Sequence, residues 1–272
     1  MTYQDLSGVR VAVSDGVATL TIDNPPLNLL DETLILALRT FAARVRDDAA
    51  VRVIVFESAD PDFFIAHGDM RFVTEPSRLA AYADADVLPG TNMMQTLHEE
   101  IRALPQVTIG KLAGFARGGG NELLMALDMR FAALGRGGQA QPETRMGIIP
   151  GGGGTQYLTA LAGRARALEL ILGGALADPA LAERYGLINR ALPASDLDAF
   201  VTTLARHIAT LSPAVIQAAK TAIDGHSLTT ENEALTSLFT ADAVIRAQRL
   251  LDAGVQTREG ELRLEDLIDE VH

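Results

Sequence analysis

The chain has 272 residues, of which 48% are apolar and 21% are charged, a balance typical of a folded globular protein and not of a disordered one. It contains no cysteine, which excludes disulfides, thiolate metal sites and cysteine nucleophiles. The formal net charge of −12 disfavours nonspecific binding to nucleic acid. The first residues lack the pattern of a secretory signal, and no apolar run is long enough to span a bilayer, so we expect a cytoplasmic protein with no membrane partner.

The first half of the chain begins with alternating predicted strands and helices. Val9–Asp23 has the pattern of a hairpin, because apolar residues alternate on both sides of the turn Ser14–Gly16. Asp31 is placed to cap a helix that continues to Asp48 with apolar residues at helical spacing. Val51–Ser58 is short, continuously apolar and rich in β-branched residues, which is typical of a strand buried on both faces.

Further along the chain the alternation continues and then stops. We predict a helix over Thr91–Leu104 and a strand over Gln106–Gly114, while Asn121–Ala133 begins with a helical pattern and allows a strand at its end. Such alternation predicts an α/β fold with parallel strands. Beyond Pro193 every segment is helix-like, so we predict a domain boundary between residues 1–194 and a helical region over residues 195–272. The helix-like segments are Ser195–Leu211, Pro213–Gly225 and Glu231–Gly254.

The glycines are concentrated in the middle of the chain. Twelve of the 24 lie between Gly114 and Gly154, in two clusters that each run into a helix-like segment. Backbone N–H groups at a helix start, with no Cβ in the way, form a receptor for an anion or an oxyanion. The surrounding segment is locally basic, which suits an anionic small molecule but is equally explained by scattered solvated arginines.

Several named glycine motifs are excluded. Neither cluster has the Gly-Lys-Ser/Thr of a phosphate-binding loop or the Gly-x-Gly-x-x-Gly spacing of a dinucleotide site. No Gly-x-Ser-x-Gly nucleophile elbow and no His-Glu-x-x-His metal motif occurs. With five scattered histidines and no cysteine, we expect no catalytic metal.

Two glutamates stand beside the glycine clusters. Glu122 follows the first cluster and Glu143 precedes the second, 21 positions further along, so only the fold can bring them together. Taken singly, Glu122 is also explained as an acid in the first turn of a helix, and Glu143 as a solvated loop carboxylate. Together, they form a candidate pair for general acid–base chemistry.

Six motifs, in order along the chain, resemble those of the crotonase (enoyl-CoA hydratase/isomerase) superfamily. The resemblance implies a core of stacked ββα turns in a superhelix, followed by a C-terminal helical region that serves oligomerisation, in homotrimers or dimers of trimers. It also implies an acyl-CoA thioester ligand and no cofactor other than the coenzyme A of that substrate. The motifs lie between about residues 17 and 224 and read ATLTIDNPPLNLL, DFFIAHGDM, GFARGGGNELLMALDMRFAA, QPETRMGIIPGGGGTQYL, AERYGLINRALP and LSPAVIQAAKTAI.

The same resemblance implies catalytic roles for particular residues. The backbone N–H groups of Gly68 and Gly119 match the two donors that stabilise the oxygen of a thioester enolate. Glu122 matches the residue that helps activate the water attacking C3, and Glu143 the residue that supplies a proton to C2, with exchanged roles in the reverse direction. Gly151 matches a glycine whose N–H contacts that water.

Substrate-binding positions follow in the same way. Ala66, His67 and Met70 match residues along the substrate, and the loop Phe72–Gly90 is expected to help form the acyl pocket. Because both glutamates are retained, the resemblance implies hydration of a 2-enoyl-CoA. Two alternatives stay open: an enoyl-CoA isomerase in which one glutamate shuttles a proton, and a catalytically degenerate paralogue that binds acyl-CoA.

Three single positions depart from the family pattern. His67 replaces a glycine, where it either fills the turn as a polar side chain or contacts the acyl or pantetheine end of the substrate. Lys111 stands in a predicted strand where a small residue is usual, and Arg117 precedes the glycines where an aliphatic residue is usual. If buried, each of these cations needs a partner, either a carboxylate or a coenzyme A phosphate.

The segment before Glu143 also departs from the pattern. Gln139-Ala140 stands where Phe-Gly is usual, and one extra residue lies between Asp128 and Glu143. Such a change could displace the Glu143 carboxylate, and a misplacement of about 1 Å can cost about a hundredfold in rate.

Overall fold

The computed structural model describes residues 2–75, 77–80 and 87–271. It divides into two compact units, Met1–Leu211 and Ser212–His272. The predicted boundary after residue 194 therefore lies one helix before this division. That helix, α9 (Leu197–Ala209), packs on the main sheet and so belongs to the first unit.

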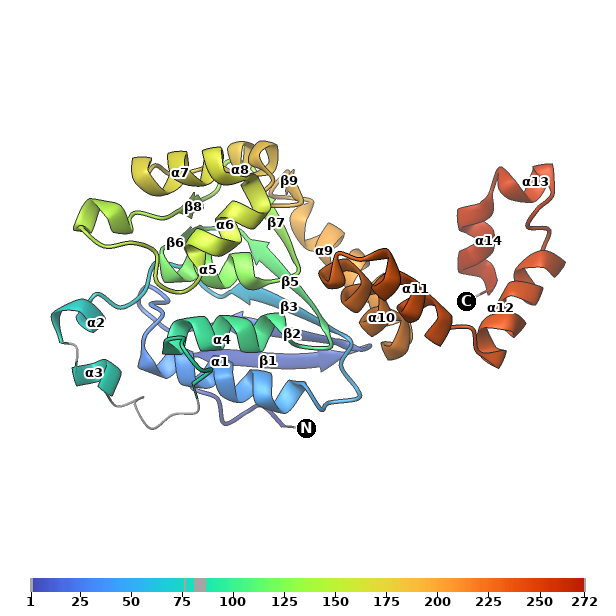
Figure 1. Cartoon of the computed structure of the whole chain (residues 1–272), viewed down its shortest axis with the longest axis horizontal. Helices are drawn as coiled ribbons and strands as arrows, with labels where there is room; N and C mark the ends of the chain where they lie inside the picture. Colours follow the sequence, from blue (N-terminus) through green and yellow to red (C-terminus); the bar gives the residue numbers. More distant parts are fainter. Residues whose placement is uncertain (1, 76, 81–86, 272) are drawn as a thin grey trace. The chain divides into compact units, whose positions relative to one another are not determined.

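A six-stranded sheet extends through the whole of the first unit (Figure 1). Only the hairpin of β1 and β2 is antiparallel, with Ser14 opposite Val17, and every other neighbouring pair is parallel. Asp15 and Gly16 form its turn with φ values of 53° and 79°, the left-handed conformation that a two-residue hairpin favours. In spatial order the strands are β1 (Val9–Ser14), β2 (Val17–Ile22), β3 (Val53–Ser58), β5 (Val107–Leu112), β7 (Met129–Ala133) and β9 (Arg190–Leu192).

Three short parallel strands form a second sheet: β4 (Phe63–Ile65), β6 (Phe115–Arg117) and β8 (Gly138–Ala140). Each follows a strand of the larger sheet and leads towards a helix, so the chain climbs in repeated ββα turns. This confirms the predicted crotonase-like α/β core. The short strands were absent from the residue-pattern prediction, because three residues are too few to show a period.

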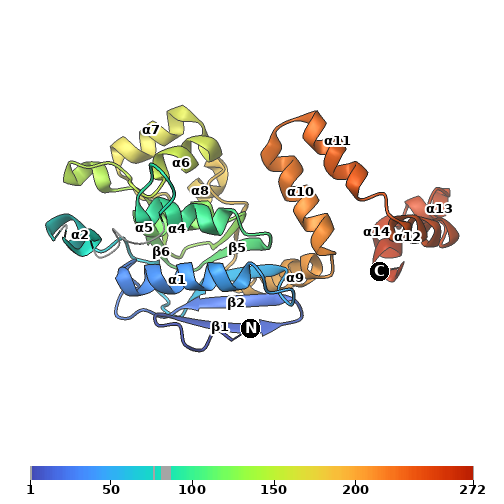
Figure 2. The same ribbon diagram turned by 60° about the horizontal axis from the view of Figure 1, so that its bottom comes forward.

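The predicted helices of the first unit are present. The Asp31 side chain caps the first of them by accepting a hydrogen bond from Leu34 N at 3.0 Å. Asn121–Ala133 does contain the end of a helix and then strand β7. Figure 2 shows α1 and α4 side by side, and the two pack against each other. The helices are α1 (Glu32–Val45), α2 (Arg71–Thr74), α3 (Ser77–Ala80), α4 (Met93–Arg102), α5 (Gly119–Ala126), the 3₁₀ helix η1 (Glu143–Met146), α6 (Gly154–Ala162), α7 (Arg164–Gly173), α8 (Pro179–Tyr185) and α9.

Strand β3 is buried on both faces, as its continuous apolar run predicts. Ile54 and Phe56 belong to the main core, while Val53 and Val55 point into a smaller core with Val201 of α9. The hydrophobic effect therefore holds α9 against the sheet and closes its second face.

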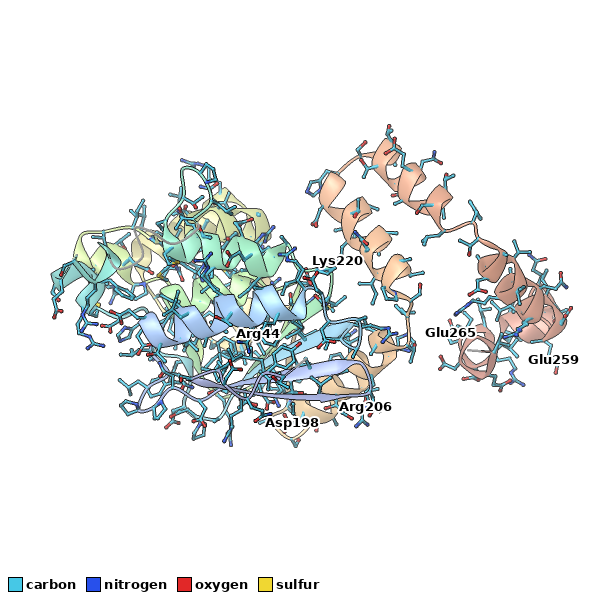
Figure 3. The ribbon with its side chains drawn as sticks, turned by 90° about the horizontal axis from the view of Figure 1, so that it is seen from below. Arg44, Asp198, Arg206, Lys220, Glu259 and Glu265 are labelled. Carbon is cyan, nitrogen blue, oxygen red and sulfur yellow. The ribbon has the colours of Figure 1, made fainter. Side chains whose placement is uncertain are left out.

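Lys111 lies on the α9 side of the sheet. Its ammonium pairs with Glu57 and donates to Asp198 Oδ1 at 2.7 Å; Asp198, on α9, is labelled in Figure 3. Burial alone would lower the pKa of Lys111, but the hydrogen bonds to Asp198 and Glu57 raise it overall. The sequence left open whether Lys111 pairs with a carboxylate or with a coenzyme A phosphate, and in the structure it pairs with carboxylates.

The second unit is entirely helical in its described residues, as the sequence predicts. Glu231–Gly254 contains two helices and not one, because the chain turns near Phe239 and Thr240 caps a new helix by accepting from Ala243 N at 3.3 Å. No single helix in the described ranges of the chain is long and apolar enough to cross a membrane. The helices are α10 (Pro213–Gly225), α11 (Leu228–Ser237), α12 (Ala241–Asp252), α13 (Arg258–Glu261) and α14 (Leu264–Val271).

Candidate active site

A cavity of about 530 Å³ lies in the first unit, between the turn after β4, the start of α4, the start of α5, η1 and the loop before α6. Ala66 does not line it; this residue is buried, and its N–H donates to Leu27 O at 3.4 Å. The remaining predicted site residues do line it: His67, Gly68, Met70, Gly119, Glu122, Glu143 and Gly151. The fold thus gathers residues from both glycine clusters at one place.

Two backbone amides of the cavity wall lie close together. Leu30 N donates to His67 O, and Asp69 N donates to Leu30 O, so the N–H of Gly68 between them points the other way. Gly119 is the first residue of α5, and the first N–H groups of a helix have no partner within it. A Cβ placed on Gly119 would lie 3.6 Å from Gly68 Cα. Neither N–H has a hydrogen-bond partner in the described part of the chain, so both are available to a ligand.

Glu122 is a buried carboxylate with only 2% of its surface exposed. Its Oε1 accepts hydrogen bonds from Gly152 N and Gly154 N, both at 2.8 Å. Burial raises the pKa of Glu122, while these two donors oppose the shift by stabilising the ionised form. A Cβ on Gly152 would lie 2.6 Å from Glu122 Oε2, so the second glycine cluster leaves space for this carboxylate.

Glu143 begins η1 and is 8% exposed. Burial raises the pKa of Glu143 to about 7, and the negative charge of Glu122 contributes to the rise. Its Oε2 is buried with no hydrogen-bond partner among the described residues. A Cβ on Gly118 would lie 2.9 Å from Glu143 Oε1, so the carboxylate lies against the first glycine cluster. Glu143 is therefore not displaced from the site by the extra residue before it.

Three buried amide side chains, next to the glutamates in sequence or two to four residues away, are linked by hydrogen bonds. Gln139 Nε2 donates to Asn121 Oδ1 at 2.7 Å, and Asn121 Nδ2 donates to Gln141 Oε1 at 2.8 Å. The backbone of Gln139 is also paired in both directions with Ala177. Strand β8 is in register with β6 through Ala140, which keeps the segment before Glu143 in place.

His98, on α4, supports the site from behind the Gly152 loop, and the sequence did not predict this role. It is fully buried, and its Nδ1 lies 2.6 Å from Gly152 O, so Nδ1 carries the proton and donates. Burial lowers the pKa of His98 to about 4, which keeps the ring neutral at physiological pH. His98 thus holds the peptide between Gly152 and Gly153, which lies between the two peptides whose N–H groups reach Glu122. A single histidine on an apolar helix face does not indicate such a role. The sequence also did not predict that Gly152 and Gly154, next to Gly151 in a run of four glycines, donate to Glu122.

The departures His67 and Arg117 both line the cavity. His67 is not in the left-handed region, so its backbone needs no glycine, and its Nδ1 lies 2.8 Å from Gly68 O. Phe72 and Val73, at the start of the predicted acyl-pocket loop, also contribute to the wall, while residues 76 and 81–86 of that loop lie outside the described residues.

The stacked turns, with two free amides and two carboxylates at one cavity, define a crotonase-type protein. The chain belongs to the enoyl-CoA hydratase/isomerase family, whose sequence model matches residues 12–250. It is 32% identical over 225 residues to a Mycobacterium tuberculosis protein provisionally named enoyl-CoA hydratase echA8, with 82% of each chain covered. It is 33% identical over 216 residues to the bovine mitochondrial protein called enoyl-CoA hydratase domain-containing protein 2, covering 78% of this chain and 71% of that one.

Solved structures agree with the family assignment. A Streptomyces avermitilis protein provisionally described as an enoyl-CoA hydratase is 46% identical and has a TM-score of 0.78, covering 97% of this chain and 98% of that one. The enoyl-CoA hydratase of Bacillus anthracis is 28% identical and has a TM-score of 0.81, covering 91% and 97%. Across the described residues, no group of three or more His, Cys, Asp or Glu side chains is placed to hold a metal ion.

Proposed function

We propose that this protein is an enzyme that adds water to a 2-enoyl-CoA thioester and forms the 3-hydroxyacyl-CoA. The observation that carries the proposal is the convergence of Glu122 and Glu143 on the cavity that also exposes the amides of Gly68 and Gly119. Coenzyme A enters as part of the substrate. The reaction transfers a proton and a hydroxyl group, and the groups that it needs are these four.

The two amides stabilise the developing enolate. As water attacks C3, negative charge moves onto the thioester oxygen, and N–H groups that are already oriented stabilise that charge without reorganisation. Because the N–H groups of Gly68 and Gly119 have no hydrogen-bond partner among the described residues, they lose no protein hydrogen bond when the oxygen arrives.

The surroundings of the two glutamates support different roles for them. Glu122 accepts two backbone N–H groups, which favour its ionised form, so it activates the water. Glu143 has an unpartnered oxygen and a pKa raised to about 7 by burial and by Glu122, so it holds the proton that C2 receives. In the reverse reaction the roles exchange.

A spectrophotometric hydration assay with short and long 2-enoyl-CoA substrates tests this proposal. Wild-type protein turns over at least one of them, and Glu122→Gln lowers kcat by a factor of about 10² to 10⁴, the usual range for losing a general base. Full turnover by Glu122→Gln would rule out the two-carboxylate mechanism. Product analysis with a 3-enoyl-CoA separates hydration from the isomerase alternative, and binding of acyl-CoA without any turnover would identify a degenerate paralogue.

We also propose that the protein is a homotrimer or a dimer of trimers. Large apolar side chains of the second unit are exposed, among them Phe239 at 73% and Leu228 at 82%, and exposed apolar patches mark association surfaces. Light scattering during size-exclusion chromatography measures the assembly directly, and a monomeric mass at micromolar concentration would contradict it.

A further inference from the structure

Arg117 places a positive charge at the cavity, and no acidic side chain among the described residues pairs with it. It ends β6 and lines the cavity together with the two glutamates. Its guanidinium carbon lies 4.0 Å from the centre of the Phe115 ring, and it forms no ion pair with any described residue. Burial lowers the pKa of Arg117.

Two other partly buried cations of the first unit pair with carboxylates. Lys111 pairs with two carboxylates, and Arg39 makes a two-point contact with Glu100. An uncompensated charge in a partly buried place destabilises a protein, so an anionic group on the ligand is the natural partner of Arg117. Stacking on Phe115 orders the guanidinium plane and leaves its N–H edge free, which is the geometry that receives a carboxylate at two points.

The position of Arg117 indicates that its partner is in the acyl part of the ligand and not among the coenzyme A phosphates. It ends β6 two residues before Gly119, and two residues span at most about 7 Å of chain, so Arg117 lies close to the amide that faces the thioester. The phosphates of coenzyme A lie at the other end of the pantetheine arm, many bonds from the thioester. A second polar side chain, His67, also lines the cavity near Arg117. A Cβ added to Gly118, the residue after Arg117, would lie 3.9 Å from the Cβ of His67.

We propose that Arg117 determines substrate specificity by binding a carboxylate at the end of the acyl group remote from the thioester. The preferred substrates are then coenzyme A thioesters of unsaturated dicarboxylic acids. This inference rests on the proposed function, because it assumes that the thioester lies at Gly68 and Gly119.

Calorimetry with saturated acyl-CoA ligands tests this inference without turnover. The two ligands have acyl chains of equal length, one ending in a carboxylate and the other in a methyl group. Wild-type protein binds the carboxylate ligand about 10- to 100-fold more tightly, as expected for a charge-assisted hydrogen bond. Arg117→Leu abolishes this preference, and Arg117→Lys, which keeps the charge, retains part of it.

Arg166→Leu is the matched control. Arg166 stacks on Tyr185 with 4.8 Å from its guanidinium carbon to the ring centre, and it does not line the cavity. The substitution removes the same charge from a similar stacked geometry and leaves the preference unchanged. Thermal unfolding of each variant confirms that it is folded, and Arg117→Lys tests the preference independently if Arg117→Leu does not fold.

Three outcomes overturn the inference. The first is that wild-type protein binds the two ligands with equal affinity. The second is that Arg117→Leu weakens the binding of both ligands equally. The third is that Arg117→Leu weakens the binding of coenzyme A thioesters but not of pantetheine thioesters, which lack the phosphates. The last result would assign Arg117 to a coenzyme A phosphate. If the carboxylate preference is found but no enoyl-CoA is hydrated, hydration fails and this inference stands. If uncharged enoyl-CoA is hydrated and no preference is found, only this inference fails.

Discussion

Oε1 of Glu122 accepts a hydrogen bond from the N–H of Gly152 at 2.8 Å, across 30 residues of sequence. The bond joins the two glycine clusters, because Glu122 follows the first of them and Gly152 belongs to the second. Gly154 adds a second donor at 2.8 Å to the same oxygen. Because Oε1 is held by these amides, we expect Oε2 to contact the water of the reaction.

Gly152→Ala tests whether the space beside Glu122 matters. Its Cβ would lie 2.6 Å from Glu122 Oε2 and 2.9 Å from His98 Cε1, so the carboxylate must move. We expect kcat for hydration to fall by about a hundredfold, since misplacement of a catalytic group by about 1 Å has an effect of this size. Steady-state kinetics measures it. Gly173→Ala is the matched control, because a Cβ there meets nothing within 4 Å, and equal activity of the two variants would contradict the prediction.

The pH dependence of kcat/KM tests the shared proton of Glu122 and Glu143. The active form carries one proton on the pair. Because the pKa of Glu143 is raised to about 7, this proton is lost as the pH rises through about 7. We expect kcat/KM to fall about tenfold for each pH unit above that value. Hydration and dehydration must show the same alkaline limb, because the overall reaction releases no proton and both directions use the singly protonated pair. A value of kcat/KM that stays constant over the roughly three pH units between pH 6 and pH 9 would contradict the assignment of the shared proton to Glu143.

His98 is predicted to position Glu122 indirectly, because it holds Gly152 O in the loop whose Gly152 and Gly154 N–H groups donate to Glu122. His98→Phe keeps a ring of similar size but leaves Gly152 O without its donor, which costs about 1–3 kcal/mol of stability and loosens the loop. We expect kcat to fall by about tenfold with little change in KM, and His98→Gln, which can still donate, to recover most of it. Kinetics and thermal unfolding check both variants. If the Phe and Gln variants have the same kcat, the hydrogen bond has no positioning role.

Lys111 is predicted to contribute to stability and not to catalysis. Lys111→Met leaves Glu57 without its partner in a partly buried place and should lower the free energy of unfolding by about 1–2 kcal/mol, with kcat/KM unchanged. Chemical denaturation gives the first value and the hydration assay the second. Arg10→Met is the control, because the pair of Arg10 with Asp23 is well exposed and such pairs contribute little. A loss of activity in Lys111→Met without a loss of stability would show that Lys111 acts on the substrate.

Much of this fold could be predicted from the residues, because long periodic segments carry a clear signal. The Val9–Asp23 hairpin, the Asp31 cap and the buried strand β3 follow from alternation, capping and a continuous apolar run. The short strand β6 and the break near Phe239 did not follow, since three residues show no period and the turn there contains no glycine or proline.

For the candidate site, the motifs predicted which glycines and glutamates come together but not how they are held. The contact of His98 with Gly152 O depends on side chains that meet only in three dimensions. Lys111 and Arg117 show the same limit. Both are cations in strand segments of similar pattern, yet one faces two carboxylates beside α9 and the other faces the cavity.

A crystal structure of the protein with a saturated acyl-CoA tests the central claim most directly. The account predicts that the thioester oxygen lies about 2.7–3.1 Å from the backbone nitrogens of both Gly68 and Gly119. It also predicts that C2 and C3 of the acyl chain lie between the carboxylates of Glu122 and Glu143. A thioester oxygen bound away from these two amides, or an acyl chain on which the two carboxylates do not converge, would contradict it.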